Sequence, residues 1–124
     1  MRRRTRLAEP PPVLAPEYLL ELAEGSTNAA AESFAASYAA LLPGRVDRII
    51  QSVGTGNRHK ATEAALSLKA ASSMAGALRM SHLCGQMEQA LVMADMAEAV
   101  IVVHNIKLHL PDLQEALAAR PPIT

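Results

Sequence analysis

The sequence has very few aromatic residues and a single cysteine. Its 124 residues include one phenylalanine, two tyrosines, no tryptophan and one cysteine. The lone cysteine excludes an internal disulfide framework. The scarcity of aromatic rings removes the stacking platforms on which single-stranded nucleic acid is bound. Half of the chain is hydrophobic, so a core must be built almost entirely from aliphatic side chains.

The chain also lacks net charge and long apolar runs. Twelve basic residues balance twelve acidic ones, so no field of one sign attracts nucleic acid or a membrane surface. No apolar run is long enough to span a bilayer. The opening "MRRRTR" is not followed by the apolar segment of a signal peptide. We therefore expect a cytoplasmic protein that binds neither nucleic acid nor membrane.

Helix-forming residues dominate what is present. Alanine, the strongest helix former, is the commonest residue, and apolar residues recur at steps of three and four. Helices are predicted over residues 16–24, 26–53, 58–74 and 77–93, and a fifth follows Asp95. Expected helix caps are Ser26 or Thr27, Asn57 and Asp95. Pro43 should kink the second helix, and Pro111 should bend or end the fifth.

Short connections between long amphipathic helices favour antiparallel neighbours. The predicted fold is therefore all-α: an up-and-down antiparallel four-helix bundle with a short extra N-terminal helix. Residues 13–120 form a single domain in this prediction. Residues 1–12 form a mobile basic, proline-rich arm, and residues 121–124 form a tail.

One segment, "GTGNRHKATEAALSLKAASSMAGALRMSHLCGQMEQAL", resembles the diagnostic region of histidine phosphotransfer (HPt) domains, the phosphate carriers of multistep phosphorelays. The positions in register with that family's pattern are Ala65, Leu68, Lys69, Ser72, Gly76, Ala77, Cys84 and Glu88. The resemblance extends over about residues 13–119. It implies an HPt-like bundle in two-component signal transduction, with the receiver domain of a response regulator or hybrid kinase as partner.

Two positions depart from the family pattern. Leu66 stands where the family has its phospho-accepting histidine, and Ala70 stands where it has a glycine. A leucine has no nitrogen lone pair, so no phosphoramidate can form there. The prediction is a degenerate member, a pseudo-HPt domain, that binds a receiver domain without carrying phosphate at the usual site. We expect no enzymatic activity and no cofactor.

The predicted partner-binding face lies on the third helix. Helical spacing places Ala61, Ala65, Leu68 and Ser72 on the core side. The residues expected at the contact are His59, Thr62, Leu66, Lys69, Ala70 and Ser73. Leu66 would anchor the partner, and Lys69 would reach toward the acidic pocket of the receiver.

Two alternatives stay open at the level of sequence. The first is an active phosphotransfer protein that uses His59 or, less favourably, His82, although Glu63 would repel a phosphate on His59. The second is a structural bundle that dimerises and has no signalling role. The favoured reading predicts a monomer or weak dimer. His104 and His109 are five residues apart, a poor spacing for a shared metal ion, and Cys84 is expected to be buried and inert.

Overall fold

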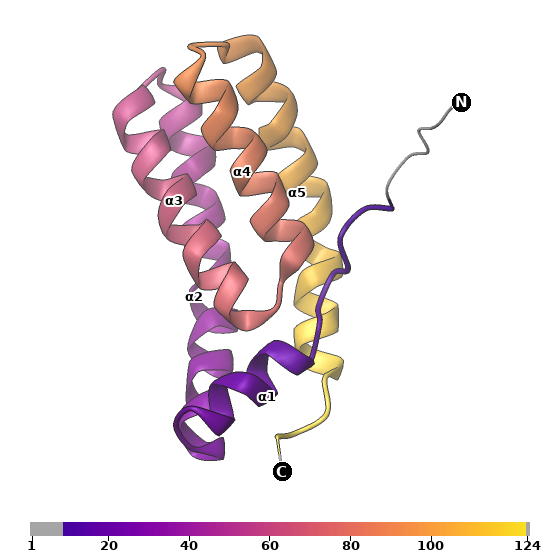
Figure 1. The fold of residues 1–124 in the computed structure, drawn as a ribbon. Coiled ribbons are helices and arrows are strands. Elements are labelled where there is room, and N and C mark those ends of the chain that lie inside the picture. The colour runs from indigo at the N-terminus through magenta and orange to yellow at the C-terminus, as the bar shows by residue number, and fades with distance from the viewer. Residues whose placement is uncertain (1–8, 124) are drawn as a thin grey trace, which may run out of the picture.

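The computed structural model describes residues 9–123, which contain five helices and no strand (Figure 1). The helices are α1 (Glu17–Glu24), α2 (Asn28–Gly54), α3 (Arg58–Ala75), α4 (Leu78–Val92) and α5 (Met96–Ala119). Helix α2 packs against α3 and α5, and α4 packs against α3 and α5, so these four helices enclose one core. Helix α1 lies across one end, against α2 and α3. The prediction of an all-helical chain is confirmed.

Side-chain caps fix where three of the helices begin. Thr27 Oγ1 accepts a hydrogen bond from the backbone N–H of Ala30 at 2.9 Å. Asn57 and Asp95 cap α3 and α5 in the same way, each at 3.0 Å. Such a cap stabilises a helix by about 1 kcal/mol. The caps at Asn57 and Asp95 were predicted correctly. Of the two candidates before α2, Thr27 is the cap, because Ser26 Oγ donates instead to Leu22 O.

Both internal prolines lie inside continuous helices. Helix α2 runs through Pro43, and α5 runs through Pro111 as far as Ala119. Pro111 was expected either to bend the fifth helix or to end it, and the second of these predictions is therefore wrong. Both prolines are exposed, so water can hydrogen-bond the backbone carbonyls that they leave without an N–H partner.

The core is aliphatic, as the scarcity of aromatic residues requires. Its largest fully buried side chains include Leu42, Ile49, Leu68, Met80, Met87, Leu91, Ile106 and Leu113. The side of α3 predicted to face this core, with Leu68 and Ser72, is indeed buried. One polar pair interrupts the apolar interior: Tyr38 Oη and Ser72 Oγ are hydrogen-bonded at 2.6 Å. Burial raises the pKa of Tyr38 to about 12, so the phenol stays neutral and satisfied.

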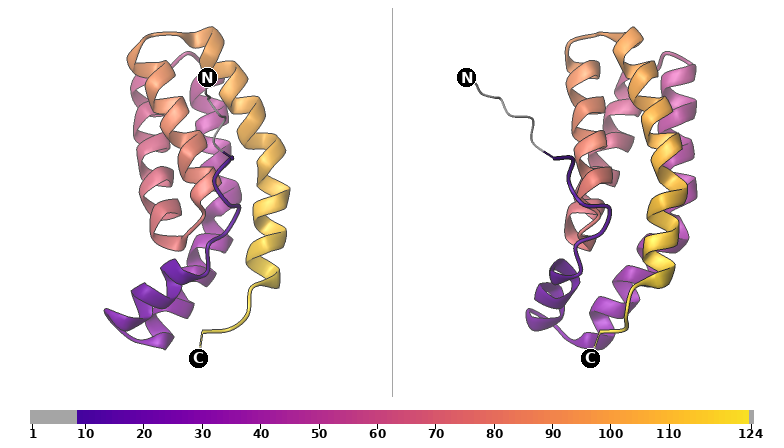
Figure 2. Two further views of the ribbon diagram at one scale, coloured as in Figure 1. Left: turned by 45° about the vertical axis from the view of Figure 1, so that its right-hand side comes forward. Right: turned by 90° about the vertical axis from the view of Figure 1, so that its right-hand side faces the viewer.

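The residues before α1 are attached to the bundle at the α3–α4 turn (Figure 2). We call residues 10–15 the strap. The backbone N–H of Ala15 donates to Gly76 O at 2.8 Å, and that of Arg79 donates to Pro12 O at 3.0 Å. Arg79 Nε also donates to Pro11 O at 2.8 Å. The arm predicted to be mobile thus ends on α4 at Pro11 and Pro12, and its residues 1–8 lie outside the described residues.

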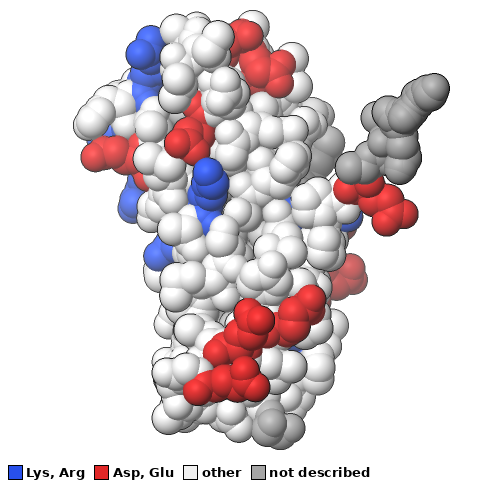
Figure 3. All heavy atoms as spheres, viewed as in Figure 1, with Lys and Arg blue, Asp and Glu red and all other residues white. Residues whose placement is uncertain are grey.

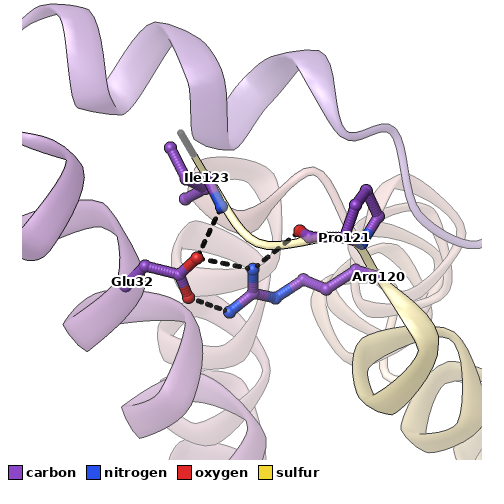
Figure 4. Close-up of polar contacts among 4 residues, drawn as sticks. All are labelled: Glu32, Arg120, Pro121 and Ile123. Atoms are coloured by element: carbon purple, nitrogen blue, oxygen red, sulfur yellow. Dashed lines mark hydrogen bonds and ion pairs between the residues drawn. The ribbon is translucent and has the colours of Figure 1, made fainter.

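The C-terminal segment is attached to α2 by a single carboxylate (Figure 4). Glu32 accepts hydrogen bonds from Arg120 Nη2 at 2.6 Å and from the backbone N–H of Ile123 at 2.6 Å. These hydrogen bonds, that from Arg120 first, lower the pKa of Glu32. The predicted tail, 121–124, is therefore held to the bundle through Ile123, and Thr124 lies outside the described residues.

The strap and the α3–α4 turn approach each other closely at Gly76. Its φ of +81° lies in the left-handed region, and a Cβ at this position would clash with Ala15 O. We expect Gly76→Ala to lower the free energy of unfolding by about 2 kcal/mol or more, from backbone strain and the clash together. Chemical denaturation monitored by circular dichroism measures the change.

Gly85→Ala is the matched control for this substitution. Gly85 lies inside α4, and a Cβ there would meet nothing within 4 Å. Alanine is the better helix former, so the control should gain about 0.5–1 kcal/mol. Equal effects of the two substitutions would show that Gly76 is not required at the turn.

Candidate functional site

The predicted contact residues lie along the side of α3 that faces away from the core. Leu66, near the middle of α3, is 43% exposed. Ala70 is exposed, whereas Thr62 and Ser73 are half-buried. Leu66 is the largest apolar side chain among the predicted contact residues. The arrangement offers an apolar contact point that a partner can approach closely.

Helix α4 contributes to the same face through two polar contacts with α3. Lys69 Nζ lies 3.1 Å from Glu88 Oε1, and Ser73 Oγ lies 2.7 Å from Ser81 Oγ. Lys69 was predicted to reach toward a partner, but in the isolated chain it is paired with Glu88. Both side chains are partly exposed, so the pair contributes at most about 1 kcal/mol and can be exchanged for another.

Charge is sparse over much of this face (Figure 3). The surface over α4 and the adjoining part of α3 is largely uncharged, whereas acidic side chains gather over α1. The acidic residues of α1 are Glu17, Glu21 and Glu24. A partner that approaches the Leu66 face therefore meets apolar and neutral polar groups together with the charged pair Lys69–Glu88.

His59 lies at the start of α3, apart from Leu66. Its side chain is 85% exposed, and Nε2 lies 3.7 Å from Glu63 Oε2. His59 lines a shallow cleft of about 540 Å³ with Arg58, Thr62 and residues 91–92. The neighbouring carboxylate disfavours a second negative group on the imidazole. Leu91 and Val92 of this cleft were missed by sequence reasoning, because nothing in the local pattern places the end of α4 beside the start of α3.

The other histidines are distributed over separate surfaces. His82 is exposed on α4, with Nε2 3.3 Å from Gln86 Nε2. His104 is exposed on α5, whereas His109 is buried there, and its Nε2 has no hydrogen-bond partner. Within residues 9–123, no group of three or more His, Cys, Asp or Glu side chains is arranged to hold a metal ion.

Searches against family models, curated proteins and solved structures found no match to this chain. Across the part of the chain that the structure describes, no helix is long and apolar enough to cross a membrane. The docking role of the Leu66 face therefore stays a prediction, supported by the residues and their placement alone.

Cys84 lies beneath this face and is fully buried. Burial raises the pKa of its thiol to about 12, although the nearby charge of Lys69 opposes that shift. At pH 8 only about one thiol in ten thousand would then be ionised. We expect iodoacetamide to label the native protein far more slowly than the same protein in guanidinium chloride. Labelling of native Cys84 at the unfolded rate would contradict its assignment as inert core.

Proposed function

We propose that this chain is an HPt-like docking module, an up-and-down antiparallel four-helix bundle with a short leading helix. It binds the receiver domain of a response regulator or hybrid kinase and carries no phosphate at the usual site. The observation that supports this most directly is the exposure of Leu66 on the outer side of α3, where the HPt resemblance places the phospho-acceptor. Such partners also suggest that it works in the cytoplasm.

The side chains around Leu66 supply contacts but no phosphoryl acceptor. Leu66 has no lone pair, and Lys69 holds its ammonium group against Glu88. His59 is seven residues away, about 10 Å along the helix axis, and carries Glu63 beside it. The proposed role is therefore competitive or scaffolding. The module occupies the active-site face of the receiver without accepting its phosphoryl group.

Burial of Leu66 would contribute directly to the affinity. Full burial of a leucine contributes about 1.5–3 kcal/mol, and roughly two fifths of Leu66 remains to be covered. A partner would thus gain about 1 kcal/mol from this side chain. Ala70 and Ser73 are small enough to let a second backbone approach. Lys69 can leave Glu88 at little cost and pair with carboxylates of the receiver.

Leu66→Asp tests this proposal, with Leu41→Asp as its matched control. Leu41 is 52% exposed and undergoes the same chemical change on another helix, α2. We expect Leu66→Asp to weaken binding of receiver domains from the same organism at least about tenfold, which is 1.4 kcal/mol or more. The control should bind like the wild type. Calorimetry measures affinity, and circular dichroism checks that both variants keep their helices.

Phosphorylated receiver domains, carrying labelled phosphate, provide the second measurement. We expect binding without acid-labile label on this chain. Label on His59 or His82 would establish a carrier instead. Equal binding by the two variants would show that the partner does not contact Leu66. Loss of helicity in Leu66→Asp alone would show that Leu66 supports the core.

A dimerising bundle is the second candidate function, favoured by one observation. Val100, Ile101 and Leu108 are large, apolar and exposed on the outer side of α5. Sedimentation of the protein alone separates the two candidates. The docking module is a monomer or weak dimer without a receiver, whereas the structural role requires a stable oligomer that Leu108→Asp disrupts.

A further inference from the structure

A cleft of about 410 Å³ lies between the strap, α4 and α5, and none of the predicted contact residues of α3 lines it. Figures 1 and 2 show the strap passing along these two helices before α1 begins. The polar and titratable side chains in the cleft lining include Arg79 and His82 from α4, with His109 and Asp112 from α5. Pro10 and Pro11 of the strap form another wall.

His109 is the buried titratable group of this cleft. It is 6% exposed, and its Nε2 is buried without a hydrogen-bond partner. A neutral imidazole tolerates that environment far better than an imidazolium, which would bury an unpaired N–H donor together with its charge. The proposed docking function makes no use of this residue.

The charges around His109 also oppose its protonation. Burial lowers the pKa of His109 below the ordinary 6.5, and the positive Arg79 lowers it further. Asp112 on the same helix acts in the opposite direction, and it and Arg79 are the charged groups that act on the ring. His82 lines the same cleft from α4. As the pH falls below about 6.5, an opened form therefore binds a proton that the closed form does not, and acid favours opening.

The strap is the element whose attachment depends on Arg79. Three hydrogen bonds hold it to the bundle, and Arg79 donates two of them, to Pro11 O and Pro12 O. If the guanidinium of Arg79 moves away from a protonated ring, its hydrogen bond to Pro11 O is strained or lost. The strap then keeps only its two backbone hydrogen bonds, from Arg79 N–H to Pro12 O and from Ala15 N–H to Gly76 O. Helix α5, by contrast, is fixed by fully buried side chains on either side of His109, at Ile106 and Leu113. The weakest element that touches the cleft is thus the strap.

We propose that residues 10–15 form an acid-released strap, with His109 as the proton sensor and Arg79 as the link between the sensor and the strap. At neutral pH the imidazole is uncharged and Pro10 and Pro11 of the strap form one wall of the cleft. Protonation of His109 favours the form in which the strap has left Arg79 and the ring reaches water. The proposal is independent of the docking function.

Amide hydrogen exchange between pH 7.5 and 5 tests the switch, once rates are corrected for the intrinsic effect of pH. The reporters are the amides of Ala15 and Arg79, which donate to Gly76 O and Pro12 O. Core amides of α2 and α3 provide the reference. We expect protection of both reporters to fall below pH 6.5, by up to about tenfold per pH unit, while the core amides stay protected.

His109→Gln should remove this pH dependence, whereas His82→Gln, a change at the exposed histidine of the same cleft, should preserve it. Asp112→Asn provides a second test that leaves His109 in place. Without the carboxylate the closed form resists protonation further, so the total loss of protection at pH 5 should increase. Protection that is independent of pH would overturn the proposal. So would a parallel loss in the core amides, or a smaller loss in Asp112→Asn.

Discussion

The close approach of the backbone at Gly76 is the constraint on which much of the molecule depends. At this one residue the chain leaves α3, turns toward α4 and accepts the hydrogen bond from Ala15. A side chain there would occupy the space of the strap's backbone. The turn thus has two structural roles. The first is to set how α4 packs against α3, and the second is to hold the strap. The Leu66 face depends on the packing of α4 against α3, and the His109 cleft depends on the position of the strap.

The Leu66 face and the His109 cleft differ in whether their polar side chains have hydrogen-bond or ion-pair partners. On the α3–α4 face, Lys69 and Ser73 each have a partner on α4, within reach of water. Those contacts are weak and exchangeable, which suits a surface that must exchange its own contacts for those of another molecule. In the cleft, His109 has no such partner and little access to water. A buried, unpaired imidazole of this kind suits a proton sensor and does not suit a docking contact.

The sequence predicted the helices well because the signals for them are local. Apolar spacing, three capping side chains and Gly76 each act within a few residues, and the structure has the helices they indicate. The core side of α3 was also predictable, since Leu68 and Ser72 follow from helical periodicity. The continuation of α5 beyond Pro111 could not be predicted in this way. The helix there is maintained by the burial of Leu113 and Leu117 against residues distant in sequence.

Contacts between distant residues were the part that the sequence could not supply. Lys69 was placed correctly on α3, but its pairing with Glu88 depends on the angle at which α4 returns. Pro11 of the strap, predicted to lie in the mobile arm of residues 1–12, is held by a guanidinium 68 residues further along the chain. The unpaired Nε2 of His109 likewise depends on which helices cover it. No spacing rule along one helix carries that information.

The attachment of the strap also bears on the order in which the chain can fold. Helix α4 has no side-chain cap at Ala77, and the backbone N–H of Arg79 in its first turn is satisfied by Pro12 O instead. The start of α4 is therefore completed by a segment made much earlier in synthesis. The C-terminal segment is joined to Glu32 across 88 residues in the same manner. Closing such long loops is entropically costly. The strap and residues 120–123 should therefore be attached after the helices have packed, and they should be the first described segments to detach.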